Sequence, residues 1–357
     1  MLREKIAQKI FKQPFLGLKK FSKDKRDLVG WRIFGIDYKP KYRKKFLEPL
    51  TVKNQYANTC GWAGEAGMKE IDEKIELDER VLVMIAKREG KISGDGFSNL
   101  RDNEKMVLKF GIAEKGLLKK GYRNWNEYSN YSYLTKEILD NALKHRSKSY
   151  LSLSSISEIY KAIDDGRPVS IGISWRTSFN MSGGFSWPWV LNYIKGLFVG
   201  GHKIYVYGYD LEYRNKPVFK CRNSFGVSYG DKGDFYIYAE NLAKDIKVYG
   251  AFINYDLDKN TIKWLMEFQN RIVKGKNPEV YLIQGEEKRK FPDLATFYAH
   301  GCLDEDIVKV DDEYLREIKD GKDINFWEGE VVKSVKALIQ QKQNLEIIFK
   351  KYFNELF

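Results

Sequence analysis

Residues 54–70 read NQYANTCGWAGEAGMKE, a stretch in which a glutamine and a cysteine precede a run of small, helix-compatible residues. Gln55 stands five residues before Cys60. A thiol at a helix start gains from the positive end of the helix dipole, which lowers its pKa and makes thiolate available. The glutamine amide could donate a hydrogen bond to an oxyanion formed at the same place. The stretch therefore predicts a reactive cysteine at a helix start.

The composition is typical of a folded protein with many strands. Of the 357 residues, 43% are hydrophobic and 15% are aromatic, unlike a disordered chain. The length suits one large domain plus a smaller module. The net charge of +13 comes from lysines interspersed with acidic residues, which favours a solvated surface over a nucleic-acid site. No Walker loop or zinc-finger spacing occurs, so we expect no nucleic-acid partner.

Cysteines and histidines are sparse. Cys60, Cys221 and Cys302 lie far apart without a CxxC pair, which favours a reducing compartment over a disulfide framework. Three scattered histidines have no metal-ligand spacing, so we expect neither a metal nor another cofactor. The N-terminus lacks the apolar core of a signal peptide, and no window is apolar enough for a spanning helix. We therefore expect a cytoplasmic or virion-associated location.

Changes in pattern divide the chain into five segments. They are a basic helix with an extended lead-in (1–44), a main domain (45–258), a connecting helix (259–277), a small hairpin-plus-helix module (278–326) and a heptad-patterned helix (327–357). In the last segment, apolar residues recur at alternating steps of four and three, with Lys342 as the one charge in the seam. This pattern suits either packing on the same chain or association with a partner or a second copy.

Within the main domain, helical periodicity comes first and strand alternation follows. Helices are expected over 60–75, 77–90, 101–111, 135–145 and 155–164, and strands over 169–175, 202–211, 216–224, 233–239 and 249–257. A further helix is expected over 260–274, leaving this domain. Helices followed by antiparallel strands predict an α+β fold.

Two later residues complete a possible acyl-transfer site. Such chemistry needs a thiolate, an imidazole that takes and returns its proton, a group that orients the imidazole, and donors for the oxyanion. His202 begins an apolar strand in GGHKIYVYGYD, and Asn223 follows a strand in CRNSFGVSYGDKGDFYI. Each by itself is typical of a structural residue. Their order after Gln55 and Cys60 predicts a catalytic set of four.

These motifs resemble those of papain-like cysteine peptidases, in particular bacterial and phage members. The matching residues are Gln55, Cys60 and Trp62-Ala63, then His202 with Val206-Tyr207-Gly208-Tyr209, then Asn223-Ser224-Phe225-Gly226. The resemblance covers about residues 45 to 256 and implies a two-lobed fold, with a helical lobe followed by an antiparallel β lobe. It assigns YAENLAKDIKVYGAFIN to the family's strand after the asparagine motif. Residues 278–326 resemble a small module appended to bacterial and phage surface proteins.

The resemblance also implies roles for the residues that match. Cys60 would be the nucleophile, His202 the base and then the acid, and Asn223 the group that orients the imidazole. Gln55 and the backbone N–H of the nucleophile would form the oxyanion hole. The implied activity is cleavage of protein or peptide amide bonds through an acyl-enzyme.

Substrate contacts follow from the same resemblance. Gly94, Gly96 and Phe97 match the Gly-rich substrate-binding strand, and Phe225 stands where the family has a tryptophan that shields the His–Asn hydrogen bond. The lead-in before Cys60 is short for the helical inhibitory pro-region of secreted relatives, so we do not expect zymogen control.

Three features depart from the family pattern. The Gln–Cys spacing is one residue short, which puts Gly61 at the nucleophile position; Lys203 follows His202 where the family has a small residue; and the usual disulfide cysteine is absent. A shortened loop would let Cys60 act, with Glu70 matching a buried glutamate of the family. Otherwise the chain is an inactive pseudo-peptidase that serves as a structural or binding component. Transamidation or deamidation, which differs only in the acceptor, is a further alternative.

Overall fold

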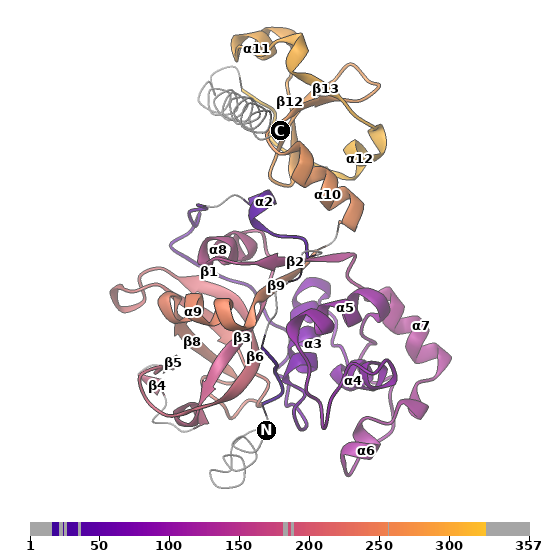
Figure 1. Ribbon diagram of the computed structural model, residues 1–357, viewed down its shortest axis with the longest axis vertical. Coiled ribbons are helices and arrows are strands. Elements are labelled where there is room, and N and C mark those ends of the chain that lie inside the picture. The colour runs from indigo at the N-terminus through magenta and orange to yellow at the C-terminus, as the bar shows by residue number, and fades with distance from the viewer. Residues whose placement is uncertain are drawn as a thin grey trace, which may run out of the picture. The chain divides into compact units, whose positions relative to one another are not determined.

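The computed structural model describes residues 16–20, 24, 27–34, 37–180, 185–186, 189–255 and 257–325. They form two compact units (Figure 1). The first unit lies within Met1–Trp31 and Gly35–Asp258, and the second within Arg32–Phe34 and Lys259–Phe357. The predicted heptad helix and the predicted N-terminal basic helix lie outside the described residues, so both stay predictions.

Helices form one side of the first unit (Figure 1). They are α3 (Cys60–Glu73), α4 (Glu79–Arg88), α5 (Leu100–Phe110), α6 (Trp125–Tyr128) and α7 (Lys136–Lys144), with a 3₁₀ turn, η1 (Tyr131–Tyr133). α4 and α5 begin after Asp78 and Asn99, whose side chains accept backbone N–H groups of the first turn. The apolar faces of these helices meet around Trp62, which is fully buried.

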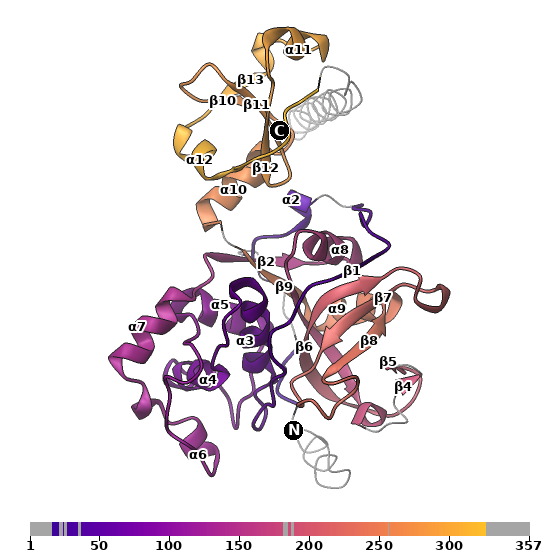
Figure 2. The ribbon, with the colours of Figure 1, turned by 180° about the vertical axis from the view of Figure 1, so that it is seen from behind.

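A nine-stranded sheet forms the other side (Figure 2). Its order is β2-β9-β3-β6-β7-β8-β5-β4, and β1 also pairs with β6. The strands are β1 (Lys44–Phe46), β2 (Ser149–Leu153), β3 (Val169–Arg176), β4 (Phe185–Ser186), β5 (Val190–Leu191), β6 (Phe198–Asp210), β7 (Val218–Arg222), β8 (Asp234–Tyr238) and β9 (Ala251–Tyr255). Helices α8 (Ile156–Asp164) and α9 (Ala239–Tyr249) pack on the sheet, and two 3₁₀ turns, η2 (Thr177–Asn180) and η4 (Tyr213–Asn215), lie between strands.

The helices and the sheet meet where α3 packs on β6. A Cβ at Gly64 would lie 2.8 Å from Cε of Lys203, and one at Gly67 would lie 2.8 Å from Cε1 of Tyr205, so these glycines permit a close approach. Gly64 and Gly67 follow Cys60 by four and seven residues, which puts all three on one helix face. Strand β6 also carries His202. The interface between the two sides therefore runs directly through the residues singled out by the sequence.

The second unit contains a five-stranded sheet of order β13-β10-β11-β12-β14. Its elements are α10 (Lys259–Phe268), β10 (Ile272–Lys274), β11 (Val280–Gln284), β12 (Glu287–Lys290), α11 (Leu294–Ala299), η5 (Asp304–Asp306), β13 (Ile307–Lys309), α12 (Asp312–Glu317) and β14 (Lys319–Asp320), with most of α2 (Trp31–Phe34). Phe291 and Phe297 lie in its core.

The α+β class predicted from the sequence is confirmed, and two elements differ from the prediction. Residues 239–249, which the resemblance assigned to a strand, form α9, because their buried apolar residues recur at helical spacing. The helix expected over 260–274 ends at Phe268, since Asn270 takes a left-handed conformation (φ 57°) and strand β10 follows. Among the helices of the described ranges, none is long and apolar enough to cross a membrane.

Candidate functional site

Cys60 is the first residue of α3 and is completely buried. Its Sγ accepts a hydrogen bond from the backbone N–H of Lys203, with an N···S distance of 3.5 Å. Burial raises the pKa of the Cys60 thiol, whereas backbone N–H groups of Lys203, Gly17 and Gly61, together with the Lys203 charge, lower it. Burial outweighs these groups, so the net shift of the pKa is upward, opposite to the lowered pKa expected for a thiol at a helix start.

The orientation of α3 distinguishes Cys60 from its neighbour Gly61. A Cβ added at Gly61 would meet the Oγ of Ser98 at 2.5 Å and the side-chain amide of Asn103 at 2.8 Å, on the side of α5. Cys60 instead contacts the backbone of β6 through its sulfur. Although Gly61 occupies the family position by count, the residue that faces β6 is Cys60.

His202 is held by the loop that follows β7. Its Nε2 lies 2.8 Å from Oδ1 of Asn223, and the same Oδ1 accepts the backbone N–H of Ser224 at 2.7 Å. Because Oδ1 is an acceptor for both groups, Nε2 is assigned as the donor and carries the proton. Nδ1 is then the acceptor of the neutral ring. Among the described residues, this buried Nδ1 has no hydrogen-bond partner.

Two aromatic rings enclose the imidazole of His202. The ring centroids of Trp175 and Phe225 each lie 4.6 Å from that of His202. This enclosure leaves His202 fully buried, and burial lowers its pKa to about 4 although the bond to Asn223 acts in the opposite direction. The imidazole is therefore neutral at physiological pH, which is the form that can accept a proton.

Gln55 is tied to the loop that holds Asn223. Its backbone N–H donates to the carbonyl oxygen of Ser224 (2.7 Å), and its Oε1 accepts the Ser224 hydroxyl (2.6 Å). Its Nε2 donates to the carbonyl oxygen of Ala57 at 2.8 Å. The structure thus brings the loop before α3 beside the loop after β7, as the predicted set of four requires.

Gly94, Gly96 and Phe97 form a tight turn ahead of α5. Phe97 exchanges backbone hydrogen bonds with Ser93 (3.0 and 3.1 Å), and the two glycines adopt positive φ values of 60° and 125°. The indole N–H of Trp62 donates to the carbonyl oxygen of Gly96 at 3.1 Å, which fixes the turn against α3. The turn therefore lies next to the start of α3.

Residues 16–19, here called the N-terminal strap, run as an extended segment between the helical side and the sheet. The strap pairs in parallel with Ser98 and antiparallel with Gly201, which lies one residue before His202. The bonds run from Ser98 N–H to Gly17 O (2.9 Å), from Lys19 N–H to Ser98 O (2.8 Å) and from Leu18 N–H to Gly201 O (3.2 Å). Backbone groups on both sides of the site are thus occupied by the chain's own N-terminal part.

Packing fixes the strap as firmly as its hydrogen bonds. Leu16 and Leu18 are 5% and 6% exposed, and Leu18 belongs to the same apolar cluster as Cys60. A Cβ at Gly17 would lie 2.6 Å from the carbonyl carbon of Asn58, so no larger residue fits there. The strap therefore accounts for part of the burial of Cys60.

Sequence reasoning missed Ser98, Gly201 and Trp175. The first two act through backbone N–H and C=O groups, which leave no mark in a sequence. Trp175 lies near the end of an apolar stretch on β3, and no sequence pattern predicted that its ring would pack against the imidazole of His202. A signal for Ser98 was available, because it follows directly on the turn at Gly94–Phe97.

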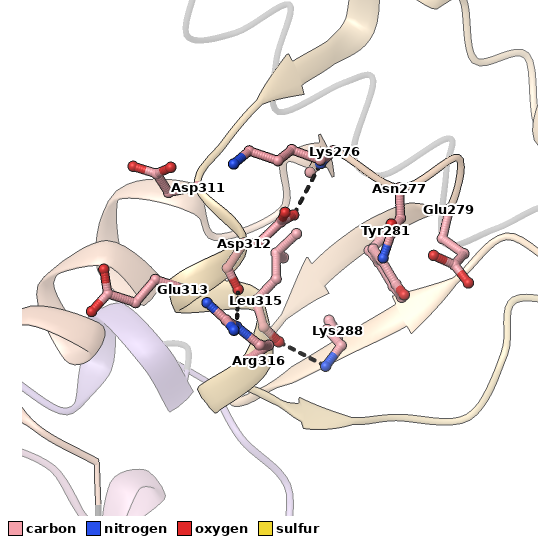
Figure 3. A pocket seen from close by; sticks show the side chains of 11 residues that line it. Lys276, Asn277, Glu279, Tyr281, Lys288, Asp311, Asp312, Glu313, Leu315 and Arg316 are labelled. Carbon is pink, nitrogen blue, oxygen red and sulfur yellow. Dashed lines mark hydrogen bonds between the residues drawn. The ribbon is translucent and has the colours of Figure 1, made fainter.

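Metal-ligating groups and a surface hollow are the two other kinds of possible site. No group of three or more His, Cys, Asp or Glu side chains within the described residues could hold a metal ion. A hollow of about 580 Å³ in the second unit is lined by charges of both signs (Figure 3). There Asp312 accepts the backbone N–H of Lys276 at 2.9 Å, and Lys288 donates to the carbonyl oxygen of Leu315 at 2.7 Å. These contacts shape the walls and do not single out a ligand.

The fold matches those of solved papain-like cysteine proteases. Xylellain, a cysteine protease from Xylella fastidiosa, aligns with a TM-score of 0.55 and 20% identity over 68% of this chain and 97% of its own. ProCathepsin B S9 from Trypanosoma congolense aligns with a TM-score of 0.50 and 12% identity over 68% of this chain and 83% of its own. No protein-family model and no curated protein matches the sequence. The chain therefore has the papain-like fold that its motifs predict.

Proposed function

We propose that the first unit is a cysteine endopeptidase that cleaves protein or peptide amide bonds through an acyl-enzyme on Cys60. One observation carries this proposal. Cys60 faces β6 at the residue after His202, and His202 has its Nε2 bonded to Asn223 while its Nδ1 is buried without a partner among the described residues. No hydrogen bond joins this Nδ1 to the sulfur of Cys60 in the described residues. A neutral imidazole with an unbonded acceptor nitrogen, one residue before the backbone N–H that bonds the thiol, supports general-base activation once the two side chains meet.

In the proposed mechanism, Nδ1 of His202 takes the proton of the Cys60 thiol, and the thiolate attacks the carbonyl carbon of the scissile amide. The oxyanion is stabilised by the backbone N–H of Cys60 and by the side-chain amide of Gln55 after it leaves Ala57. The imidazolium, oriented by Asn223, then protonates the leaving amine as the C–N bond breaks. Water, activated by the same imidazole, hydrolyses the thioester and regenerates the thiol.

The enzyme as described would be latent, since Cys60 is completely buried and the strap occupies the backbone groups beside it. Catalysis requires that residues 16–19 leave. An extended peptide substrate would then bond to the same groups of Ser98 and Gly201. The turn at Gly94–Phe97 and the ring of Phe225 are proposed to line the substrate's path.

A second candidate function is a papain-fold binding protein that has lost catalysis. It is favoured by the complete burial of both Cys60 and His202. In this alternative the strap never leaves, and the second unit together with the predicted helix 327–357 serves in assembly.

Hydrolysis by a strap variant distinguishes the two functions. Full-length Gly17→Val should cleave a mixture of fluorogenic peptides and react with an epoxide thiol reagent at Cys60. Adding Cys60→Ser or His202→Ala should abolish cleavage, and Asn223→Ala should reduce it. A folded Gly17→Val variant that exposes Cys60 to iodoacetamide but hydrolyses no peptide would favour the binding function.

A further inference from the structure

A buried cluster of charged side chains lies beside the start of α3. Lys203 of β6 has a side chain with no exposed surface, and its ammonium forms a salt bridge with Glu65 of α3, which is equally buried. Glu104 of α5 is 1% exposed and completes the cluster. One cation and two carboxyl groups from three elements therefore meet in the interior, between the helices and the sheet.

The charges of this cluster balance when one carboxyl group is protonated. Burial raises the pKa of Glu104 well above its usual value, and the nearby charge of Glu65 raises it further. Glu104 is accordingly neutral, and Lys203 is paired with the Glu65 carboxylate. A buried ion pair contributes little net stability compared with apolar residues of similar size. Stability alone therefore does not explain why Lys203 and Glu65 form a buried pair beside the start of α3.

Lys203 is fixed at both ends. Its side-chain stem crosses Gly64, where an added Cβ would lie 2.8 Å from Cε, and its ammonium is held by Glu65. Its backbone N–H donates to the sulfur of Cys60. Gly64 is one helical turn beyond Cys60, so the cation is anchored close to the thiol.

We propose that Lys203 is a positioning residue for Cys60, which holds a backbone N–H against the sulfur and places a buried cation where it favours the thiolate. Glu65 anchors the ammonium, and Glu104 stays neutral and adds no opposing charge. The apolar cluster of Cys60 holds two further titratable side chains, Tyr249 of α9 and the partly buried Tyr150 of β2, and Leu18 of the strap brings no charge to it. His202, one residue before Lys203, is neutral because its imidazole is buried. The inference rests on the proposed function only in that a thiolate is the nucleophile.

The test measures ionisation of Cys60 in the full-length protein, with no substrate. Thiolate absorbance near 240 nm is followed against pH, and the signal of the matching Cys60→Ser protein is subtracted at each point. Lys203→Met should raise the midpoint of Cys60 ionisation by about one pH unit, which is about tenfold less thiolate at a given pH. Lys203→Arg keeps the cation and should stay near the parent midpoint.

Lys53→Met is the matched control. Lys53 forms a comparably buried pair with Glu70 on the same helix, and Glu70 lies ten residues beyond Cys60. Loss of that pair should destabilise the fold without moving the midpoint of Cys60. Glu104→Gln should also leave the midpoint unchanged, because it mimics the neutral acid. A structural role alone would give Lys203→Met and Lys53→Met the same midpoint, and that result would overturn the proposal.

Should Lys203→Met fail to fold, the double variant Lys203→Met/Glu65→Leu replaces the pair with apolar side chains, a change that buried ion pairs often tolerate. Its midpoint should again rise, and an unchanged midpoint would refute the role of the cation. The measurement does not depend on turnover. A shifted midpoint together with no peptide hydrolysis by folded Gly17→Val would support the role of Lys203 and reject the peptidase.

Discussion

Replacing Gly17 with valine should expel the N-terminal strap and expose Cys60. A Cβ at this position would lie 2.6 Å from the carbonyl carbon of Asn58, and the clash involves backbone on both sides. Rotation of side chains cannot relieve it. The closed position of residues 16–19 is thereby excluded, while the rest of the first unit keeps its contacts.

The size of the effect follows from what holds the strap. Leu16 and Leu18 are 5% and 6% exposed, and burial of each stabilises the closed state by about 2 kcal/mol. The three backbone hydrogen bonds add about 1 kcal/mol each. Ordering the four residues costs about 5 kcal/mol in all. The closed state is then favoured by about 2 kcal/mol, or about thirty closed molecules for each open one.

Alkylation of Cys60 by iodoacetamide, followed by mass spectrometry of its peptide, measures the open population. Gly17→Val should react about thirtyfold faster than the parent. Gly121→Val is the matched control, because a Cβ there meets nothing within 4 Å, and it should react like the parent. Cys221 and Cys302, both buried, report unfolding and should stay unlabelled. Equal Cys60 rates in the parent and Gly17→Val would refute the reasoning.

Three further outcomes are expected from denaturation in urea. Burial lowers the pKa of His202 from 6.5 to about 4, so the unfolded chain binds a proton at His202 before the folded protein does, and the free energy of unfolding falls between pH 6.5 and 4. His202→Gln should remove up to about 3 kcal/mol of that fall. Identical dependence of stability on pH in the parent and the variant would contradict this. Gly96→Ala should lower the free energy of unfolding by about 3 kcal/mol, because Gly96 has φ 125° and its Cβ would lie 2.8 Å from backbone. Gly94→Ala should lower it by about 1 kcal/mol, because Gly94 has φ 60° and the nearest neighbour of its Cβ would lie at 3.7 Å. Equal losses of stability would count against the steric reasoning. Lys288→Met should lower the free energy of unfolding by about 2 kcal/mol, since the buried ammonium donates to two backbone carbonyls at the end of α12. Lys319→Met, at an exposed lysine, is the control and should change stability by less than about 0.5 kcal/mol. A similar loss of stability in both variants would contradict the prediction for Lys288.

Several properties of this protein were readable in its sequence. The order of Gln55, Cys60, His202 and Asn223 predicted the fold, because each motif is local and the family resemblance links them in sequence order. Helix starts were equally local, as at Asn99, whose side chain accepts the backbone N–H of Asp102 in the first turn. The strand predicted for residues 239–249 was wrong, because apolar residues at helical spacing make this segment an amphipathic helix.

Other properties were decided only by the tertiary structure. Whether Cys60 or Gly61 faces β6 depends on the rotational phase of α3, which is set by where the helix begins and how closely it packs on its neighbours. The place of the strap depends on backbone hydrogen bonds to Ser98 and Gly201, and every residue type can supply those. The burial of Lys203 depends on the space beside Gly64 of α3, which a larger residue would fill. The sequence by itself thus determined which reactive groups are present and in what order, whereas long-range packing determined which of them face one another and which are covered.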